Sequence, residues 1–395
     1  LSSEIFLIAA DHYTDDQILA YLRKWVQDDN LKFLMRVASR NLTLVEIIDA
    51  LRQYRDLYVR GVDLSLASKR GVIVALITRF LSGQPSYISV AKSFCDISDF
   101  FEFLDRVVYT ADSHGKLGGK TAGLFLAKQI LRRSPAASDL TAAVKTPRSW
   151  YIASDVLLSF LSCNNMDEVV EQKYKDINDV RREYPHVIQA FKNGRFPPEI
   201  VQALSVVLDD FEDKPLIVRS SSLLEDSSGA AFSGKYRSLF IANQGAKQER
   251  LDALMDAIAE VYASIVGPDP IEYRAERGLL DMNEEMGIMI QEVVGSRLGR
   301  YFLPAYAGVA FTNNEFRWSA RIKREDGLIR LVPGLGTRAV DRVGDDYPIL
   351  VAPGQPGLRV NVTPDEIVRY SPRKVDLVNL ETERFETVEI QDLFA

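Results

Sequence analysis

One segment near the middle of the chain combines an arginine, serines and glycines in a pattern suited to binding an anion. The apolar run Leu216 to Val218 predicts a buried strand, and Arg219 and three serines follow it. Because glycine permits backbone conformations closed to other residues, peptide N–H groups of the next loop can surround phosphate oxygens, with the guanidinium as a fixed cation. The small residues of this loop are Ser227, Ser228, Gly229, Ala230, Ser233 and Gly234. A surface turn in which Arg219 pairs with Glu225 or Asp226 fits the same spacing.

A lysine in the first turn of a predicted helix is the second candidate for binding an anion. Gly118-Gly119-Lys120 precedes Thr121 to Arg133, a run of good helix formers that ends in two arginines suited to the negative end of a helix. A cation at the positive end is unfavourable by itself, and an anion between the lysine and the helix would remove the conflict. A solvated Lys120 fits the same residues, so both interpretations stay open at this point.

The elements before residue 110 are predicted to be mostly helical. The segments Thr14 to Gln17 and Thr43 to Glu46 each have the form of a capping box and open an apolar-periodic run. Two further apolar segments, Val72 to Leu81 and Phe100 to Val108, complete this helical region. It contains no pattern of catalytic residues, since His12 stands alone.

Strands and helices alternate after residue 110. Residues 144 to 155 predict a turn, a strand and, at Ala153-Ser154-Asp155, the start of a capped helix, and residues 164 to 195 predict an insertion or a mobile helical pair. Met286 to Val294 predicts a half-buried, alternating strand with two outward polar residues. Further helices are predicted at Glu199 to Phe211, Leu251 to Ser264 and from Thr363, and a hairpin at Val375 to Ile390.

The composition is that of an ordinary globular protein with two or three domains. The chain has 395 residues, of which 47% are hydrophobic and 26% charged. No apolar run is long enough to cross a bilayer, and the two cysteines, Cys95 and Cys163, favour a reducing cytoplasm. A net charge of -7 without a long basic tract argues against nucleic-acid binding but allows ATP. No cluster of Cys, His and acidic residues has the spacing of a metal site.

Residues 218 to 234, VRSSSLLEDSSGAAFSG, resemble the VRSSA-x-x-ED-x-x-x-A-S-F-A-G signature of the nucleotide-binding domain of phosphoenolpyruvate synthase and pyruvate phosphate dikinase. The residues in register are Arg219, Ser220, Ser221, Glu225, Asp226, Ala231, Phe232 and Gly234. The Gly118, Gly119 and Lys120 triplet resembles the start of that domain. The resemblance implies an ATP-grasp-like fold in which Lys120 and Arg219 bind ATP phosphates and the small-residue loop covers them.

Further motifs of this family follow in order. The segment Gln291, Glu292, Val293 and Val294 is similar to its V-Q-x-M-V strand, whose backbone is implied to contact adenine. Arg148-Ser149 stands where Pro-Gly is usual in its V-P-P-G-F segment, and Thr337 stands where glutamate is common after its G-L-G turn. Tyr262 to Ser264 and Tyr273-Arg274 resemble its W-A-S-L and Y-R elements. The resemblance extends from about Leu117 to about Asp346.

We therefore expect an α+β (α/β) protein with mixed sheets. Residues 1-110 are expected to form a helical N-terminal region, 111-350 the ATP-grasp-like domain, and 351-395 a short helix and hairpin at the start of a truncated region. The resemblance implies the ATP-binding part of a dikinase-type phosphotransferase, which passes phosphate from ATP to a histidine carrier and then to pyruvate or another acceptor.

The sequence lacks two elements of the complete enzymes, the glycine-rich histidine motif and the final acidic segment that supplies magnesium ligands. We expect a fragment that is inactive alone, with ATP and Mg²⁺ as cofactors, with most Mg²⁺ ligands and the phosphohistidine domain outside it, and with no nucleic-acid or membrane partner. The alternative is a non-catalytic nucleotide-sensing or scaffold module whose helical region binds partners.

Overall fold

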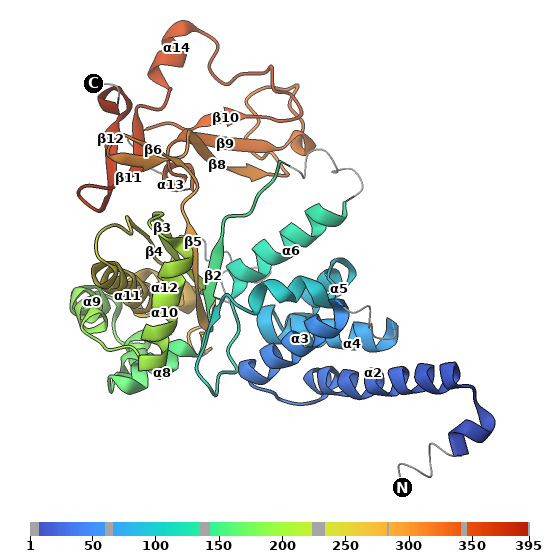
Figure 1. Ribbon diagram of the computed structural model, residues 1–395. Helices are drawn as coiled ribbons and strands as arrows, with labels where there is room; N and C mark the ends of the chain where they lie inside the picture. Colours follow the sequence, from blue (N-terminus) through green and yellow to red (C-terminus); the bar gives the residue numbers. More distant parts are fainter. Residues whose placement is uncertain are drawn as a thin grey trace.

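The computed structural model describes residues 8–59, 66–134, 143–222, 234–282, 284–340 and 346–393. Figure 1 shows helices of the first third of the chain packed beside a central sheet, with the remaining strands gathered above them. Within the described ranges no helix is both long enough and apolar enough to span a membrane. The expected class, α+β with mixed sheets and a helical N-terminal region, is confirmed.

The first hundred residues are mainly helical, as predicted. Both capping boxes form, because Thr14 and Thr43 each exchange hydrogen bonds with the residue three positions on. The predicted helix over Phe100 to Val108 is wrong in its second half: a 3-10 helix ends at Phe103, and Val107–Val108 form a strand of the central sheet. The helices are α2 (Asp15–Ser39), α3 (Leu44–Val59), α4 (Leu66–Leu76), the π-helix Ile77–Leu81, α5 (Pro85–Phe94) and the 3-10 helix Ile97–Phe103.

The central sheet has five strands in the order β1-β2-β5-β3-β4. Only the pair β1 and β2 is parallel among its described pairings. The predicted strand at Leu216 extends to Ser222, so that Arg219 and the serines belong to the strand itself. The strands are β1 (Val107–Val108), β2 (Ser149–Ile152), β3 (Leu216–Ser222), β4 (Ser238–Ile241) and β5 (Met286–Glu292).

The predicted half-burial of β5 is wrong. Its first six residues are all buried, and Gln291 is only 4% exposed. The reason is that β5 lies between β2 and β3 and is covered on both faces: Leu117, just before α6 (Gly119–Arg133), lies over Gly287, and α8 (Val156–Cys163) packs on the sheet as well.

One hydrophobic core joins the N-terminal helices to this sheet. The cluster of buried side chains runs from Leu34 in α2 to Ile290 in β5. Aromatic rings bridge the two parts: Phe103 packs against Phe125 of α6 at 5.2 Å between centroids and against Tyr151 of β2 at 5.4 Å. The helical region is therefore packed against the sheet along a shared core.

Two helices on the other flank of the sheet were predicted near their observed ranges, and α12 was not predicted. Residues 164 to 195 contain the 3-10 helix Asp167–Tyr174 and α9 (Ile177–Lys192). Helix α9 packs against α11 (Lys247–Ala263) and α12 (Pro268–Glu276), and α10 (Pro198–Phe211) packs against α11. Their buried faces complete the core behind β3.

The C-terminal strands form two smaller sheets, with orders β12-β11-β7-β6 and β10-β9-β8. The predicted hairpin is confirmed as β11 (Lys374–Asn379) and β12 (Arg384–Glu389). Phe240 of β4 stacks on Phe385 of β12 at 5.5 Å between ring centroids, so this part contacts the central sheet. The other elements are β6 (Ser296–Leu298), β7 (Tyr301–Leu303), β8 (Tyr306–Phe311), β9 (Leu328–Pro333), α13 (Thr337–Val340), β10 (Ile349–Val351) and α14 (Pro364–Arg369).

Candidate nucleotide-binding site

The structure brings the two predicted anion-binding motifs together. The side-chain amine of Lys120, in the first turn of α6, donates to Ser220 Oγ of β3 at 3.2 Å. Ser220 is fully buried, and the two residues are 100 positions apart in the sequence. A lysine at the positive end of a helix and a buried serine thus share one location, which favours binding of an anion there.

The glycine turn before α6 fits against β3 because it lacks side chains. Gly118 has φ +83°, and a Cβ at this residue would lie 1.5 Å from the carbonyl oxygen of Ser221. Ser221 Oγ donates to the carbonyl of Leu117 at 2.9 Å and accepts from the Thr121 N–H at 3.3 Å. A buried hydroxyl therefore bonds the residues on both sides of the turn.

Asp155 holds the loop at residues 113–115, which leads into the glycine turn. The predicted helix forms as α8 with Asp155 at its N-cap, but this side chain makes no capping hydrogen bond to it. Its carboxylate instead accepts from Ser113 Oγ at 2.7 Å and from the backbone N–H groups of His114 and Gly115 at 2.7 and 2.9 Å. His114 itself is a loop residue, as expected. The hydroxyl and N–H groups of residues 113–115 thus compete with the first turn of α8 for the Asp155 carboxylate.

A line of polar side chains crosses the three central strands. Arg219 Nη1 of β3 donates to Gln291 Oε1 of β5 at 3.2 Å, and Gln291 Nε2 donates to Ser149 Oγ of β2 at 2.9 Å. In the register of the sheet Gln291 pairs with Ser149 and lies diagonally from Arg219, so the three side chains share one face. This face presents the cation and the amide in a fixed geometry.

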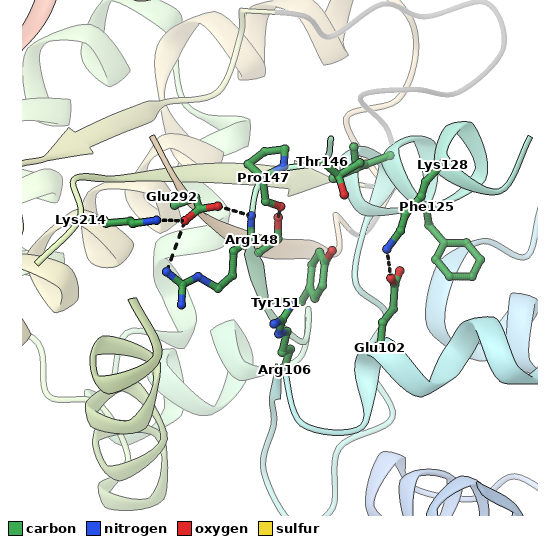
Figure 2. A pocket seen from close by; sticks show the side chains of 12 residues that line it. Glu102, Arg106, Phe125, Lys128, Thr146, Pro147, Arg148, Tyr151, Lys214 and Glu292 are labelled. Carbon is green, nitrogen blue, oxygen red and sulfur yellow. Dashed lines mark hydrogen bonds and ion pairs between the residues drawn. The ribbon is translucent and has the colours of Figure 1, made fainter. Parts of the chain in front are cut away.

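A pocket of about 360 Å³ lies at the end of β2 and β5, beside α6 (Figure 2). Lys128 pairs with Glu102 on one side of it, and Glu292 lies on the other. Burial raises the pKa of Tyr151, which lines the floor. The lining residues are Glu102, Arg106, Leu124, Phe125, Lys128, Thr146, Pro147, Arg148, Ser149, Tyr151, Lys214 and Glu292. With four cations against two carboxylates, the pocket favours ligands that carry negative charge.

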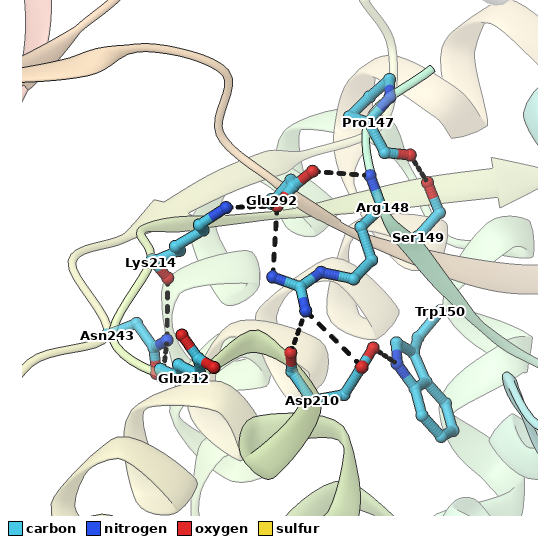
Figure 3. Close-up of polar contacts among 9 residues, drawn as sticks. All are labelled: Pro147, Arg148, Ser149, Trp150, Asp210, Glu212, Lys214, Asn243 and Glu292. Carbon is cyan, nitrogen blue, oxygen red and sulfur yellow. Dashed lines mark hydrogen bonds and ion pairs between the residues drawn. The ribbon is translucent and has the colours of Figure 1, made fainter. Parts of the chain in front are cut away.

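Glu292 is the centre of a polar network at this pocket (Figure 3). Its carboxylate accepts from the Arg148 N–H at 2.9 Å and from Lys214 Nζ at 3.2 Å, and Arg148 Nη2 lies 3.4 Å away. Burial raises the pKa of Glu292, but the bond from the Arg148 N–H and the nearby cations outweigh it, so the pKa lies below the ordinary 4.5. Asp210 also pairs with Arg148 and accepts from Trp150 Nε1 at 2.8 Å.

The predicted adenine contacts at the end of β5 are partly occupied by protein partners. The N–H of Glu292 donates to the carbonyl of Arg148 at 3.0 Å, and the N–H of Val293 donates to the carbonyl of Pro215 at 2.8 Å. Val293 is buried, whereas Val294 is exposed. A contact of this segment with adenine stays a prediction, and it would use groups other than these two N–H groups.

Part of the predicted site lies outside the described residues. This holds for Ser227, Ser228, Gly229, Ala230 and Ser233, and for the acidic pair Glu225 and Asp226. Gly234 is described and has φ +76°. In the described part no three His, Cys, Asp or Glu side chains gather as a metal site would require.

Sequence reasoning named Glu292 as a site residue but did not predict the pocket that it lines. One signal was available: Lys120, Leu124 and Lys128 follow at intervals of four, which places them on one face of α6. Arg106 and Tyr151 come from elements that no local pattern connects to that helix.

Comparison with known proteins agrees with this geometry. A family model described as the pyruvate phosphate dikinase AMP/ATP-binding domain matches residues 114–393. The chain belongs to this family. A curated relative is the phosphoenolpyruvate synthase of Aquifex aeolicus (strain VF5), 24% identical over 271 residues. That match covers 65% of this chain and 26% of the relative, so the chain spans about a quarter of the relative's length. The family match also continues beyond Asp346, where the sequence motifs end.

This member of the dikinase family departs from the usual motif after Gly334-Leu335-Gly336. Thr337, which stands where glutamate is common, donates to Asp376 of β11. Arg338 lies 3.8 Å from the same carboxylate and 3.7 Å from Asp346, and all three charged side chains are buried. The turn is therefore bonded to the C-terminal hairpin, and we assign it no contact with ATP.

Proposed function

We propose that this chain binds ATP between the first turn of α6 and the polar face of the central sheet, as the ATP-binding part of a dikinase-type phosphotransferase. The observation that carries the proposal is the bond between Lys120 and Ser220, which joins two motifs of the family at one point. Family membership supports the same ligand class. In the proposed reaction, phosphate passes from ATP to a histidine carrier and then to pyruvate or another acceptor.

The charges of the site fit a bound triphosphate. Lys120 and the N-terminus of α6 supply positive potential at one end, and Arg219 adds a guanidinium held by Gln291. Lys128 follows Lys120 by eight residues, or about 12 Å along the helix. That distance is on the scale of an extended nucleotide, so the pocket at Lys128 is where we place the nucleoside. Preorganised charges of this kind stabilise phosphoryl transfer electrostatically.

Magnesium is the expected companion of ATP, but the described residues do not assemble a site for it. We therefore assign no residue to Mg²⁺ and derive no step through it. The role of the described side chains is to bind and orient the phosphates.

Titration calorimetry with ATP and MgCl₂ tests the proposal. Lys120→Ala and Arg219→Ala should each weaken ATP binding by about tenfold or more, because charge-assisted bonds contribute about 1.5–3 kcal/mol. Lys247→Ala is the matched control: Lys247 also begins a helix, α11, but it pairs with Asp209. Equal affinity in all four proteins would contradict the proposal.

We further propose that this chain by itself makes no phosphoenolpyruvate from ATP and pyruvate. Its three histidines, His12, His114 and His186, have none of the glycine-rich surroundings of a phosphate carrier. A phosphohistidine domain is thus a proposed partner. A cytoplasmic location is proposed as well, since Cys95 and Cys163 are both free thiols. A coupled assay that detected phosphoenolpyruvate, abolished by Lys120→Ala, would overturn the first part.

A further inference from the structure

One buried carboxylate joins the two chain ends that border residues 223–233. Ser222 is the last residue of β3, and Tyr236 comes shortly before β4. The hydroxyl groups of both donate to the same atom, Glu284 Oε1. The other oxygen, Oε2, lies 3.0 Å from Arg274 Nη1 of α12. Glu284 therefore connects the end of β3, the start of β4 and a helix.

The geometry of this cluster is tightly determined. The side chains of Arg274 and Glu284 are 3% and 2% exposed, so both charges depend on their protein partners. Arg274 also donates to the backbone carbonyls of Ile265 at 2.7 Å and Pro270 at 3.3 Å. Because the guanidinium is anchored on the helix side, the carboxylate has little freedom to follow movements of the hydroxyl groups.

Ser222 lies two residues from Ser220 in β3. Side chains two residues apart in a strand point to the same face, so both serines lie on one side of β3. Ser220 is the residue that accepts from Lys120. A shift or twist of Ser222 relative to Glu284 would therefore be transmitted over two residues to the proposed phosphate contact.

We propose that Glu284 is a positioning residue for nucleotide binding. It holds Ser222 and Tyr236 at a fixed separation and thereby aligns Ser220 with Lys120. The inference rests on the proposed ATP site. It goes further in assigning a role to a residue that contacts no part of that site directly. A purely structural ion pair would stabilise the fold but would leave the affinity of the folded protein for ATP unchanged.

The test uses two variants that keep both charges buried and paired. Tyr236→Phe and Ser222→Ala each remove one hydroxyl from Glu284 Oε1 in the 395-residue chain. Tyr174→Phe is the matched control, because Tyr174 also donates to a carboxylate, Asp281, at 2.9 Å but on the surface. Calorimetry measures the dissociation constant for ATP, and chemical unfolding confirms that each protein is folded.

We expect the two variants to bind ATP about 2- to 30-fold more weakly, the range typical of residues coupled to a site they do not touch. The double variant should lose less than the product of the single losses, because both act through one carboxylate. Unchanged affinity in both variants, with Lys120→Ala impaired, would overturn the role of Glu284 alone. Unchanged affinity in Lys120→Ala as well would overturn the proposed function and this inference with it.

Discussion

The two ends of the candidate site are built in different ways. At the first turn of α6, a glycine with no room for a side chain and buried hydroxyl groups hold the backbone, and the carboxylate of Asp155 holds the loop just before it. At the pocket, partly exposed ion pairs around Glu292 hold the side chains. Closely packed, buried contacts tolerate few substitutions, whereas each exposed ion pair contributes little to the stability of the fold. We therefore expect the phosphate end to be rigid and intolerant, and the pocket end to tolerate substitution.

The largest effect is expected for Gly118→Ala. The new methyl group would meet the carbonyl of Ser221 in a backbone conformation that alanine rarely adopts, so the turn must move. We expect the free energy of unfolding to fall by about 3 kcal/mol or more, with loss of ATP binding. Denaturant titration measures the first and calorimetry the second.

Gly123→Ala is the matched control for this substitution. Gly123 lies inside α6, and a methyl group there would meet nothing within 4 Å. Alanine should stabilise this helix by about 0.5–1 kcal/mol. If both variants were equally stable, the close approach of Gly118 to β3 would not be a constraint.

A moderate, pH-dependent effect is expected for Glu292→Gln. The pKa of Glu292 is lowered in the folded chain, so its carboxylate contributes stability above the ordinary pKa of 4.5, and this contribution is lost as the pH falls through the lowered pKa. At pH 7 we expect a loss of about 1 kcal/mol in the free energy of unfolding. The loss should shrink as the pH is lowered below 4.5, and unfolding curves from pH 7 to pH 3 would show it. A loss independent of pH would mean that the charge of Glu292 is not involved.

The smallest effect is expected for Lys214→Ala. Lys214 is about half exposed and reaches Glu292 from the rim, while Arg148 keeps its two contacts with the same carboxylate. We expect the free energy of unfolding to fall by less than about 0.5 kcal/mol. A loss as large as that of Glu292→Gln would show that the pocket end is as intolerant as the phosphate end.

Local signals predicted the elements well. The capping boxes at Thr14 and Thr43, the helix after Lys120 and the strand at Leu216 depend on residues a few positions apart, which the sequence displays directly. That Lys120 and the Arg219 segment lie at one site was implied by the family resemblance and not by any local pattern, and the contact of Lys120 with Ser220 was not predicted.

Nonlocal competition explains what sequence reasoning missed. Asp155 occupies a cap position but bonds to residues about 40 positions earlier, and Gln291 is buried because β5 has neighbours on both edges and both faces. The pocket draws residues from a 3-10 helix, α6, β2 and β5, and no spacing rule joins these. Such contacts depend on the tertiary packing that the elements themselves do not specify.

The parallel pairing of β1 with β2 limits where the chain can be cut without disrupting the central sheet. The strand that follows the N-terminal helices is part of the central sheet, and Phe103 packs on Phe125 and Tyr151 across the junction. A truncated chain that began near residue 111 would expose the apolar face of α6 to water and leave β2 as an edge strand. The helices that precede β1 in the described ranges and the sheet should therefore melt in a single cooperative transition, with these helices as part of the scaffold that supports α6.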